Sequence, residues 1–259
     1  MKKNQYKVDA PSRNKPLPNS DLSCGDLIVE IGRLFINIPY KAQTLECPDN
    51  EKLVVNLSAF DCTTFVETVL ALTKCAAAGN ISYYELKKYL KLIRYRQGKI
   101  DGYSSRLHYF TDWLHDNENK KIITDMTRRL GGKPQHKKIN FMTAHSQLYS
   151  ALKNEAERMK MSLIEKNLSR KTIYIIGINN FGEIKTKIKN SDVIAFATRD
   201  EGLDVAHVGF ALWQGKSLRL LHASKKENGV VISKNTLHSY LKQNKKYSGI
   251  IVARLFNNN

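Results

Sequence analysis

The sequence contains few prolines, few cysteines and no long apolar run. Six Pro among 259 residues are too few for a collagen-like or Pro-rich chain. No apolar stretch approaches the roughly 20 residues that a membrane-spanning helix requires. The four Cys form no C-x-x-C pair, which argues against a structural zinc site, and they allow three disulfide pairings or none. We expect a globular protein whose thiols are mostly part of its core.

Acidic residues are scarce relative to basic ones. The chain has 24 Asp and Glu against 42 Lys and Arg, which gives a formal net charge of +18. Such an excess predicts an anionic partner, such as nucleic acid, an acidic membrane surface or a cell-wall polymer, without choosing among them. The apolar fraction of 42% excludes wholesale disorder. A chain of this length is expected to bury about 70–75% of its unfolded surface, so it needs no metal or disulfide to fold.

The first 20 residues are rich in Lys, Asn, Ser and Pro, which predicts a flexible lead-in. Lys2 and Lys3 resemble the charged start of a secretion signal, but no apolar core follows them. Two interpretations stay open at this point. Either the protein is intracellular, or a signal peptide has been removed from this sequence.

Helical patterns fill most of the chain before residue 170, and short β runs follow. Apolar spacing predicts a helix over residues 21–36, capped by Ser20 or Asp21, and a buried helix that opens at Asp61 and ends near Gly79. Further helices are predicted over residues 82–96, 106–116, 143–168 and 236–245. Strands are predicted over residues 120–127, 172–178, 193–197, 205–213, 218–223, 230–233 and 247–255. Helices followed by an antiparallel-looking sheet indicate an α+β fold.

Cys62 lies where a helix can assist a nucleophile. It follows Asp61 in the first turn of an apolar helix, and the partial positive charge of a helix N-terminus stabilises a thiolate. A lone cysteine at such a place is more often an ordinary core residue. The case for a nucleophile therefore depends on finding a base and an orienting group elsewhere in the chain.

Two histidines lie in consecutive predicted strands. His207 is in an apolar run, and His222 ends the next run. Residues 214–217 between them have the composition of a hairpin turn, so the two strands are expected to be neighbours. Cys62, His207 and His222 can then supply the nucleophile, the base and the group that orients the base.

These segments carry a family resemblance. Asp61-Cys62 opens a helix, His207-Val208-Gly209 lies on a strand, His222-Ala223-Ser224 follows, and Pro39-Tyr40 precedes the nucleophile. The set resembles the NlpC-type, papain-like cysteine hydrolases of the cell wall. The resemblance implies a papain-like core, in which N-terminal helices pack on an antiparallel sheet, and it implies that the tyrosine borders the active site.

A closer likeness is to the N-acetylmuramoyl-L-alanine amidase-like branch of that superfamily. It is carried by PYKAQTLE (residues 39–46), DCTTFVETVLAL (61–72), DGYSSRLHYFTDWL (101–114), SDVIAFAT (191–198), GLDVAHVGF (202–210) and LLHAS (220–224). These segments cover about a third of the chain. The resemblance implies an amidase that cuts the bond between the lactyl group of N-acetylmuramic acid, including its anhydro form, and L-Ala. The role implied is wall turnover or recycling.

The distance from Cys62 to His207 along the chain exceeds that of a minimal papain-like domain. We therefore interpret residues 21–259 as one catalytic domain with a helical insertion at about 80–170, which favours a restricted pocket for a small wall fragment. Arg106 is a candidate to clamp a carboxylate, and Tyr103 to contact a sugar ring. The full set of candidate substrate-binding residues is Tyr40, Thr44, Glu46, Asp61, Tyr103, Arg106, His108 and Tyr109. An ordinary amphipathic helix over residues 106–116 is the alternative.

The leading prediction is a monomeric cysteine amidase of the bacterial periplasm or cell envelope, which needs no metal or cofactor, binds no nucleic acid and has no membrane span. Its partner is a muropeptide. A γ-D-glutamyl–diamino acid endopeptidase of the same fold is the first alternative. A basic, non-enzymatic nucleic-acid or surface-binding protein is the second, because Lys, Arg and Tyr alternate over residues 87–99.

Overall fold

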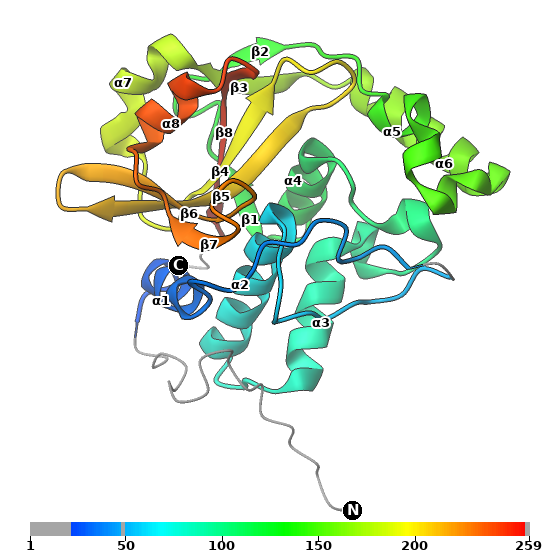
Figure 1. The fold of residues 1–259 in the computed structure, drawn as a ribbon, viewed down its shortest axis with the longest axis horizontal. Helices are drawn as coiled ribbons and strands as arrows, with labels where there is room; N and C mark the ends of the chain where they lie inside the picture. The colour runs from blue at the N-terminus through cyan, green and yellow to red at the C-terminus, as the bar shows by residue number, and fades with distance from the viewer. Residues whose placement is uncertain (1–21, 48–49, 257–259) are drawn as a thin grey trace, which may run out of the picture.

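The computed structural model describes residues 22–47 and 50–256, and the lead-in predicted at 1–20 lies outside this part. The α+β fold is confirmed, with a sheet in the order β2-β3-β8-β4-β5-β6-β7 and β1 paired to β8 (Figure 1). The helices are α1 (Cys24–Leu34), α2 (Cys62–Ala77), α3 (Tyr83–Arg94), α4 (Phe110–Asn119), α5 (Phe141–Ala144), α6 (Glu155–Ser169), α7 (Phe181–Ile184) and α8 (Leu237–Gln243). The strands are β1 (Ile123–Asp125), β2 (Lys133–Gln135), β3 (Ile173–Gly177), β4 (Val193–Thr198), β5 (Val205–Gln214), β6 (Ser217–Ser224), β7 (Gly229–Ile232) and β8 (Tyr247–Leu255). All strand pairs are antiparallel.

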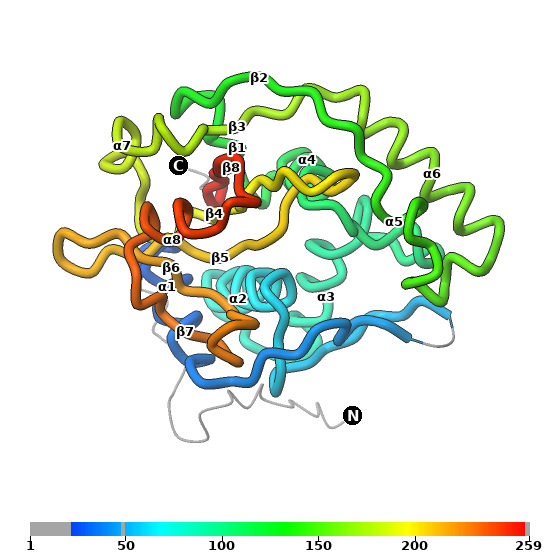
Figure 2. Tube along the Cα trace, turned by 45° about the horizontal axis from the view of Figure 1, so that its top comes forward, coloured from blue at the N-terminus to red at the C-terminus, as the bar shows by residue number. Residues whose placement is uncertain are grey.

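The centre of the sheet is buried on both faces, and every residue of β4 is buried. In β4, Val193 and Ala195 face the core shared with α1 and α2, whereas Ile194 and Phe196 face a second core with α7 and α8. Figures 1 and 2 show α1, α2 and α3 on one side of the sheet and α7 and α8 on the other. A third, smaller core joins α5 and α6 to the segment before α4. This third core belongs to the region predicted as an insertion.

The helix that carries Cys62 forms as predicted. The Asp61 side chain accepts a hydrogen bond from the Thr64 backbone N–H at 2.8 Å, and the Thr64 hydroxyl accepts one from the Asp61 N–H at 3.0 Å. This reciprocal capping satisfies two backbone donors that a helix start otherwise leaves free. The predicted caps of the first helix are wrong, because Ser23 accepts from the Asp26 N–H and α1 begins at Cys24.

Two further predictions need correction inside the insertion. The single helix expected over 143–168 is divided, and its second part, α6, starts only after the Asn154 side chain caps it. The helix expected from Arg106 begins four residues later, as α4. Arg106 instead pairs with Tyr95 in a short β-bridge, and the Leu107 N–H donates to the Arg94 carbonyl oxygen at 2.9 Å. Backbone hydrogen bonding of residues 106–107 to residues 94–95 thus replaces the first helical turn that the apolar spacing predicted from Arg106.

The hairpin predicted between the two histidine strands is confirmed. Gln214 pairs with Ser217 across the turn, and β5 and β6 continue in register from there. All four cysteines are free thiols, of which only Cys75 is fully buried. None of the helices within 22–47 and 50–256 is long and apolar enough to cross a membrane.

Candidate active site

Cys62 is the first residue of α2 and lies against the strand that carries His207. Helix α2 packs on β5, and the Val208 backbone N–H donates a hydrogen bond to the Cys62 thiol. Capping by Asp61 fixes the start of the helix, and the strand contact fixes the direction of the thiol. The predicted nucleophile and the predicted base therefore lie on two elements that touch each other.

His207 and His222 form a direct imidazole pair. His207 Nε2 lies 2.6 Å from His222 Nδ1. Close packing of β5 on β6 allows this contact, since a Cβ placed at Gly209 would lie 2.7 Å from the Cβ of His222. A side chain at Gly209 would push the strands apart, which explains why glycine stands in the His-Val-Gly segment. His222 is 1% exposed, so the pair is shielded from water on that side.

The resting thiol of Cys62 is neutral, contrary to the expectation of a stabilised thiolate. Burial, together with the negative charge of Asp61, raises the pKa of Cys62 to about 11. The hydrogen bond from Val208 opposes this shift but does not cancel it. A base must therefore remove the thiol proton as the nucleophile attacks.

Both histidines are neutral as well. Burial lowers the pKa of His207 and of His222 below the usual range, and the second imidazole lowers that of His207 further. In a neutral pair, one nitrogen donates and the other accepts. If His207 donates from Nε2 to His222 Nδ1, its Nδ1 is left as a free acceptor, which is the state that a general base needs.

Cys62 and His207 line one cavity of about 90 Å³, whose other walls are Thr63, Leu107, His108, Phe110, Trp113, Leu203, Asp204, Val205, Ala206 and Val208. Most of this wall is apolar. Asp204 is the one carboxylate in it, and its oxygens accept hydrogen bonds from Thr111 and Val205. Leu107, His108, Phe110 and Trp113 of the region predicted as an insertion therefore form one side of the cavity, and residues 62–63 and 203–208 form the other.

Two tyrosines lie close to the thiol. Tyr40 forms a parallel bridge with Phe60, and burial together with the charges of Cys62 and Asp61 raises the pKa of Tyr40 to about 12. Its hydroxyl therefore stays protonated and can donate. Tyr240 on α8 was missed by the sequence analysis. Its ring centroid lies 6.1 Å from that of His207 and 5.4 Å from that of His222, and no motif marks it.

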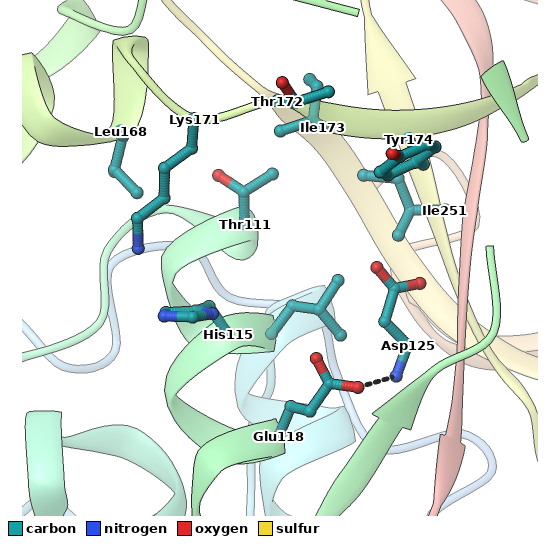
Figure 3. A pocket seen from close by; sticks show the side chains of 11 residues that line it. Thr111, His115, Glu118, Asp125, Leu168, Lys171, Thr172, Ile173, Tyr174 and Ile251 are labelled. Carbon is teal, nitrogen blue, oxygen red and sulfur yellow. Dashed lines mark hydrogen bonds between the residues drawn. The ribbon is translucent and has the colours of Figure 1, made fainter. Parts of the chain in front are cut away.

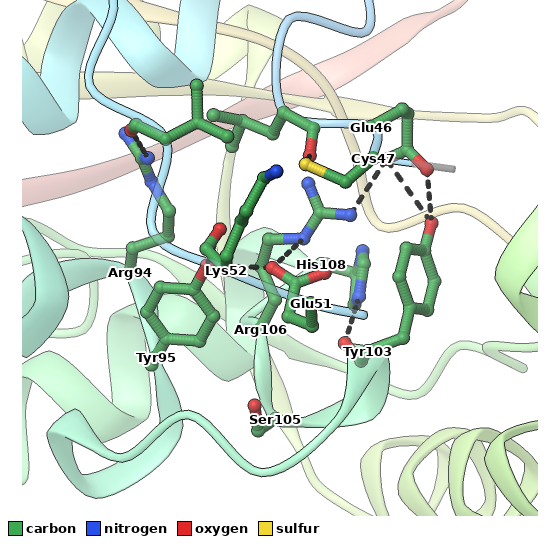
Figure 4. Close-up of polar contacts among 12 residues, drawn as sticks. Glu46, Cys47, Glu51, Lys52, Arg94, Tyr95, Tyr103, Ser105, Arg106 and His108 are labelled. Atoms are coloured by element: carbon green, nitrogen blue, oxygen red, sulfur yellow. Dashed lines mark hydrogen bonds and ion pairs between the residues drawn. The ribbon is translucent and has the colours of Figure 1, made fainter. Parts of the chain in front are cut away.

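Arg106 is already paired with protein carboxylates. Its Nη2 lies 2.8 Å from Glu46 Oε1, and its Nε lies 3.4 Å from Glu51 Oε1. The Tyr103 hydroxyl also donates to Glu46 (Figure 4). Arg106 is 5% exposed. In this arrangement Arg106 holds the Glu46 side chain in place. A bidentate clamp on a substrate carboxylate would require Arg106 to leave Glu46 and Glu51.

The remaining candidates are placed differently. Thr44 has a buried hydroxyl without a hydrogen-bond partner among the described residues. His108 lines the cavity with Cys62. The Tyr109 hydroxyl donates to Glu165 at 2.6 Å and accepts from the Met142 N–H, which commits it to packing of the insertion. We therefore leave Tyr109 out of the proposed site.

A second cavity, of about 110 Å³, lies between α4 and the start of β3 (Figure 3). His115, Glu118, Asp125 and Lys171 line it, but neither Cys62 nor His207 does. Among the residues that the structure describes, no group of three or more His, Cys, Asp or Glu side chains could hold a metal ion. Cys62 and His207 both line the first cavity, and His222 contacts His207.

A family model described as N-acetylmuramoyl-L-alanine amidase-like matches residues 30–250. The chain belongs to this amidase-like family. The family named from the sequence is thus confirmed, while the NlpC-type superfamily stays a prediction. A comparison with curated proteins finds no match.

Solved structures agree with the membership in the amidase-like family. An N-acetylmuramoyl-L-alanine amidase from Bacteroides uniformis is 38% identical, with a TM-score of 0.86 over 90% of this chain and 99% of that one. A Bacteroides fragilis protein described as a candidate xylanase is 40% identical, with a TM-score of 0.82 over 86% and 99%. A Legionella pneumophila protein, LPG0564, is 21% identical with a TM-score of 0.69 over 91% and 90%, and shares the fold.

The neutral histidines of this amidase-like chain predict a loss of stability in mild acid. Burial and the charge of Arg106 lower the pKa of His108 to about 3, and His207 and His222 are also depressed. An unfolded histidine titrates near 6.5, so the unfolded state binds more protons below that pH. The free energy of unfolding should fall by about 1.4 kcal/mol per pH unit for each of the three. Urea unfolding at pH 7, 6 and 5 measures the slope, and a flat profile would contradict the neutral assignment.

Proposed function

We propose that this chain is a cysteine amidase that cuts the bond between the lactyl group of N-acetylmuramic acid and L-Ala in small peptidoglycan fragments. The observation that carries the proposal is the shared cavity of Cys62 and His207, with His222 at 2.6 Å from His207. Such hydrolysis requires a thiol, a base with a free nitrogen and a group that orients the base. The family and the amidase from Bacteroides uniformis support the choice of bond.

In the proposed first step, Cys62 Sγ attacks the amide carbonyl carbon while His207 Nδ1 takes the thiol proton. The Cys62 backbone N–H and the Tyr40 hydroxyl donate to the oxygen on which negative charge develops. The intermediate then expels the amine of L-Ala, which receives the proton from His207. A thioester joins the lactyl carbonyl to Cys62. Water, activated by His207, attacks that thioester and releases the sugar acid and the free thiol.

His222 orients His207 without a carboxylate. By accepting from His207 Nε2, it holds the tautomer in which Nδ1 faces the thiol, and it stabilises the transient imidazolium through one hydrogen bond. Because both rings are buried and neutral, the positive charge exists only during the reaction. Tyr240 packs beside both rings and limits their rotation.

The small cavity supports a fragment rather than the intact wall as substrate. Leu107, Phe110 and Trp113 from the insertion close one side of it. A glycosidase, as the name of the Bacteroides fragilis structure would suggest, uses two carboxyl groups that flank the bond. Asp204 is the one carboxylate among the residues that line the cavity, and it is held by Thr111 and Val205. The geometry therefore favours an amidase.

Defined muropeptides with normal and anhydro sugar ends test this function. We expect release of a free peptide that begins with L-Ala, identified by mass spectrometry. Products cut after γ-D-Glu would identify the endopeptidase instead. Binding of nucleic acid without hydrolysis of any muropeptide would identify the basic binding protein. The bacterial envelope is where such fragments arise, and we propose that location and a monomeric state for this chain.

A further inference from the structure

One ring nitrogen of His108 is committed to the backbone. His108 Nε2 lies 2.8 Å from the carbonyl oxygen of Tyr103, and the two rings lie at 39° to one another with their centroids 4.4 Å apart (Figure 4). A carbonyl oxygen only accepts, so the nitrogen facing it carries the proton. The tautomer of His108 is therefore fixed as Nε2–H, and Nδ1 holds a lone pair.

His108 also stays neutral at physiological pH. Burial, together with the charge of Arg106 two residues away, lowers its pKa to about 3. A second proton on Nδ1 would thus cost free energy, so this nitrogen remains an acceptor. Within the described residues, no side chain or backbone group donates a hydrogen bond to it.

The unpartnered nitrogen belongs to a side chain that lines the cavity of Cys62 and His207. The neighbouring walls, made by Leu107, Phe110 and Trp113, are apolar and offer no donor apart from the indole N–H. The other side-chain acceptors among the lining residues are Asp204, Thr63 and His207. Asp204 is already used by Thr111 and Val205, and His207 Nδ1 is reserved for the thiol proton in the proposed mechanism. An acceptor without a partner beside apolar walls selects a ligand that brings its own donor.

We propose that His108 is a specificity-determining residue, whose Nδ1 accepts a hydrogen bond from a substrate N–H that lies beside a small apolar group. The inference rests on the proposed function, because it places that substrate at Cys62. Two parts of a muropeptide have this chemistry. One is the acetamido group of the sugar, and the other is the amide of L-Ala with its neighbouring methyl group.

A matched pair of variants separates the two nitrogens of His108. In His108→Gln, the side-chain amide nitrogen reaches about the position of Nε2, so the bond to the Tyr103 carbonyl is kept and the acceptor at Nδ1 is lost. In His108→Asn, the side-chain oxygen lies near the position of Nδ1, so the acceptor is kept. If His108 has only a packing role, the Asn variant should lose more affinity for the muropeptide than the Gln variant. If Nδ1 binds the substrate, the Gln variant should lose more affinity than the Asn variant.

Binding to Cys62→Ala protein, measured by calorimetry, makes the test independent of turnover. We expect His108→Gln to raise the Kd for a muropeptide by about 5- to 100-fold and His108→Asn to raise it less. Thermal unfolding confirms that each variant folds. Equal affinity of the Gln variant and its parent, or no binding to the parent, would overturn the proposal. A muropeptide bound in this way but not cut by the protein with intact Cys62 would instead overturn the proposed function.

A second probe identifies the donor. A muropeptide that lacks the N-acetyl group of its sugar keeps the L-Ala amide. If the affinity ratio between parent and His108→Gln falls to about one with this probe, the acetamido group is the donor. If the ratio is unchanged, the L-Ala amide is the donor. Both results support the acceptor role of His108 and differ only in the part of the substrate that it reads.

Discussion

Replacing Cys62 by Ala is expected to lower kcat for muropeptide hydrolysis by at least about 10⁴-fold, because the acyl group then has no atom to which it can transfer. Residual activity would come only from the donors and the cavity, which still bind the substrate. The substitution removes one sulfur atom from a partly buried position, so the thermal midpoint should change little. Release of L-Ala-peptide, followed by mass spectrometry, measures the loss. Turnover at the original rate would exclude the proposed mechanism.

His207→Ala provides the matched control for this result. It removes the base but leaves the thiol, and because the pKa of Cys62 is raised to about 11, little thiolate forms without help at neutral pH. We therefore expect the activity of this variant to increase with pH as the thiol ionises unaided. Cys62→Ala has no such group and should stay inactive at every pH. A shared, flat pH profile of both variants would indicate that His207 does not act as the base.

The positions of the three proposed catalytic residues could be predicted because simple rules place them. A helix start after Asp61 fixes Cys62, and a two-strand hairpin makes His207 and His222 neighbours. The tautomer of His207 then follows from one further observation, the 2.6 Å distance between His207 Nε2 and His222 Nδ1. Tyr240 could not be found in this way, since a single aromatic residue on a short helix carries no local pattern that marks it.

The partners of Arg106 could not be predicted for a different reason. Glu46 and Glu51 lie more than fifty residues before it in the chain, and spacing contains no signal for such a long-range ion pair. The thiol pKa was also misjudged, since a helix N-terminus stabilises a thiolate only when burial does not outweigh it. Long-range contacts and burial are properties of the assembled fold, and they decide the chemistry of this site.

Arg94→Met is expected to destabilise the protein by about 3–5 kcal/mol, because it leaves a buried carboxylate without its partner. Arg94 Nε lies 2.6 Å from Glu67 Oε2, and the two side chains are 3% and 2% exposed. Arg94 Nη1 also donates to the Val54 carbonyl oxygen at 2.6 Å. Glu67 lies on α2, so this pair fixes the helix that carries Cys62 to α3 and to the segment before the nucleophile. Urea unfolding measures the change.

The pH dependence of the lost stability distinguishes the effect of an unpaired Glu67 charge from the effect of lost packing. Burial raises the pKa of Glu67, and Arg94 opposes this shift. Without Arg94, the folded state binds a proton at Glu67 that the unfolded state releases at the same pH, so the free energy of unfolding of the variant falls as pH rises. Arg94→Met should thus lose less stability at pH 5 than at pH 8, relative to the wild-type chain at each pH. A loss independent of pH would mean that packing alone is responsible.

The double variant Glu67→Leu/Arg94→Met completes the argument about α2. Removing both partners leaves no unpaired charge, so most of the stability should return. Lys88→Ala, which breaks the exposed pair of Lys88 and Glu85, should leave the stability almost unchanged and serves as the surface control. If the double variant is stable but has a lower kcat, the buried pair is retained for the direction in which α2 presents Cys62, rather than for stability. An unchanged kcat would assign the pair to stability alone.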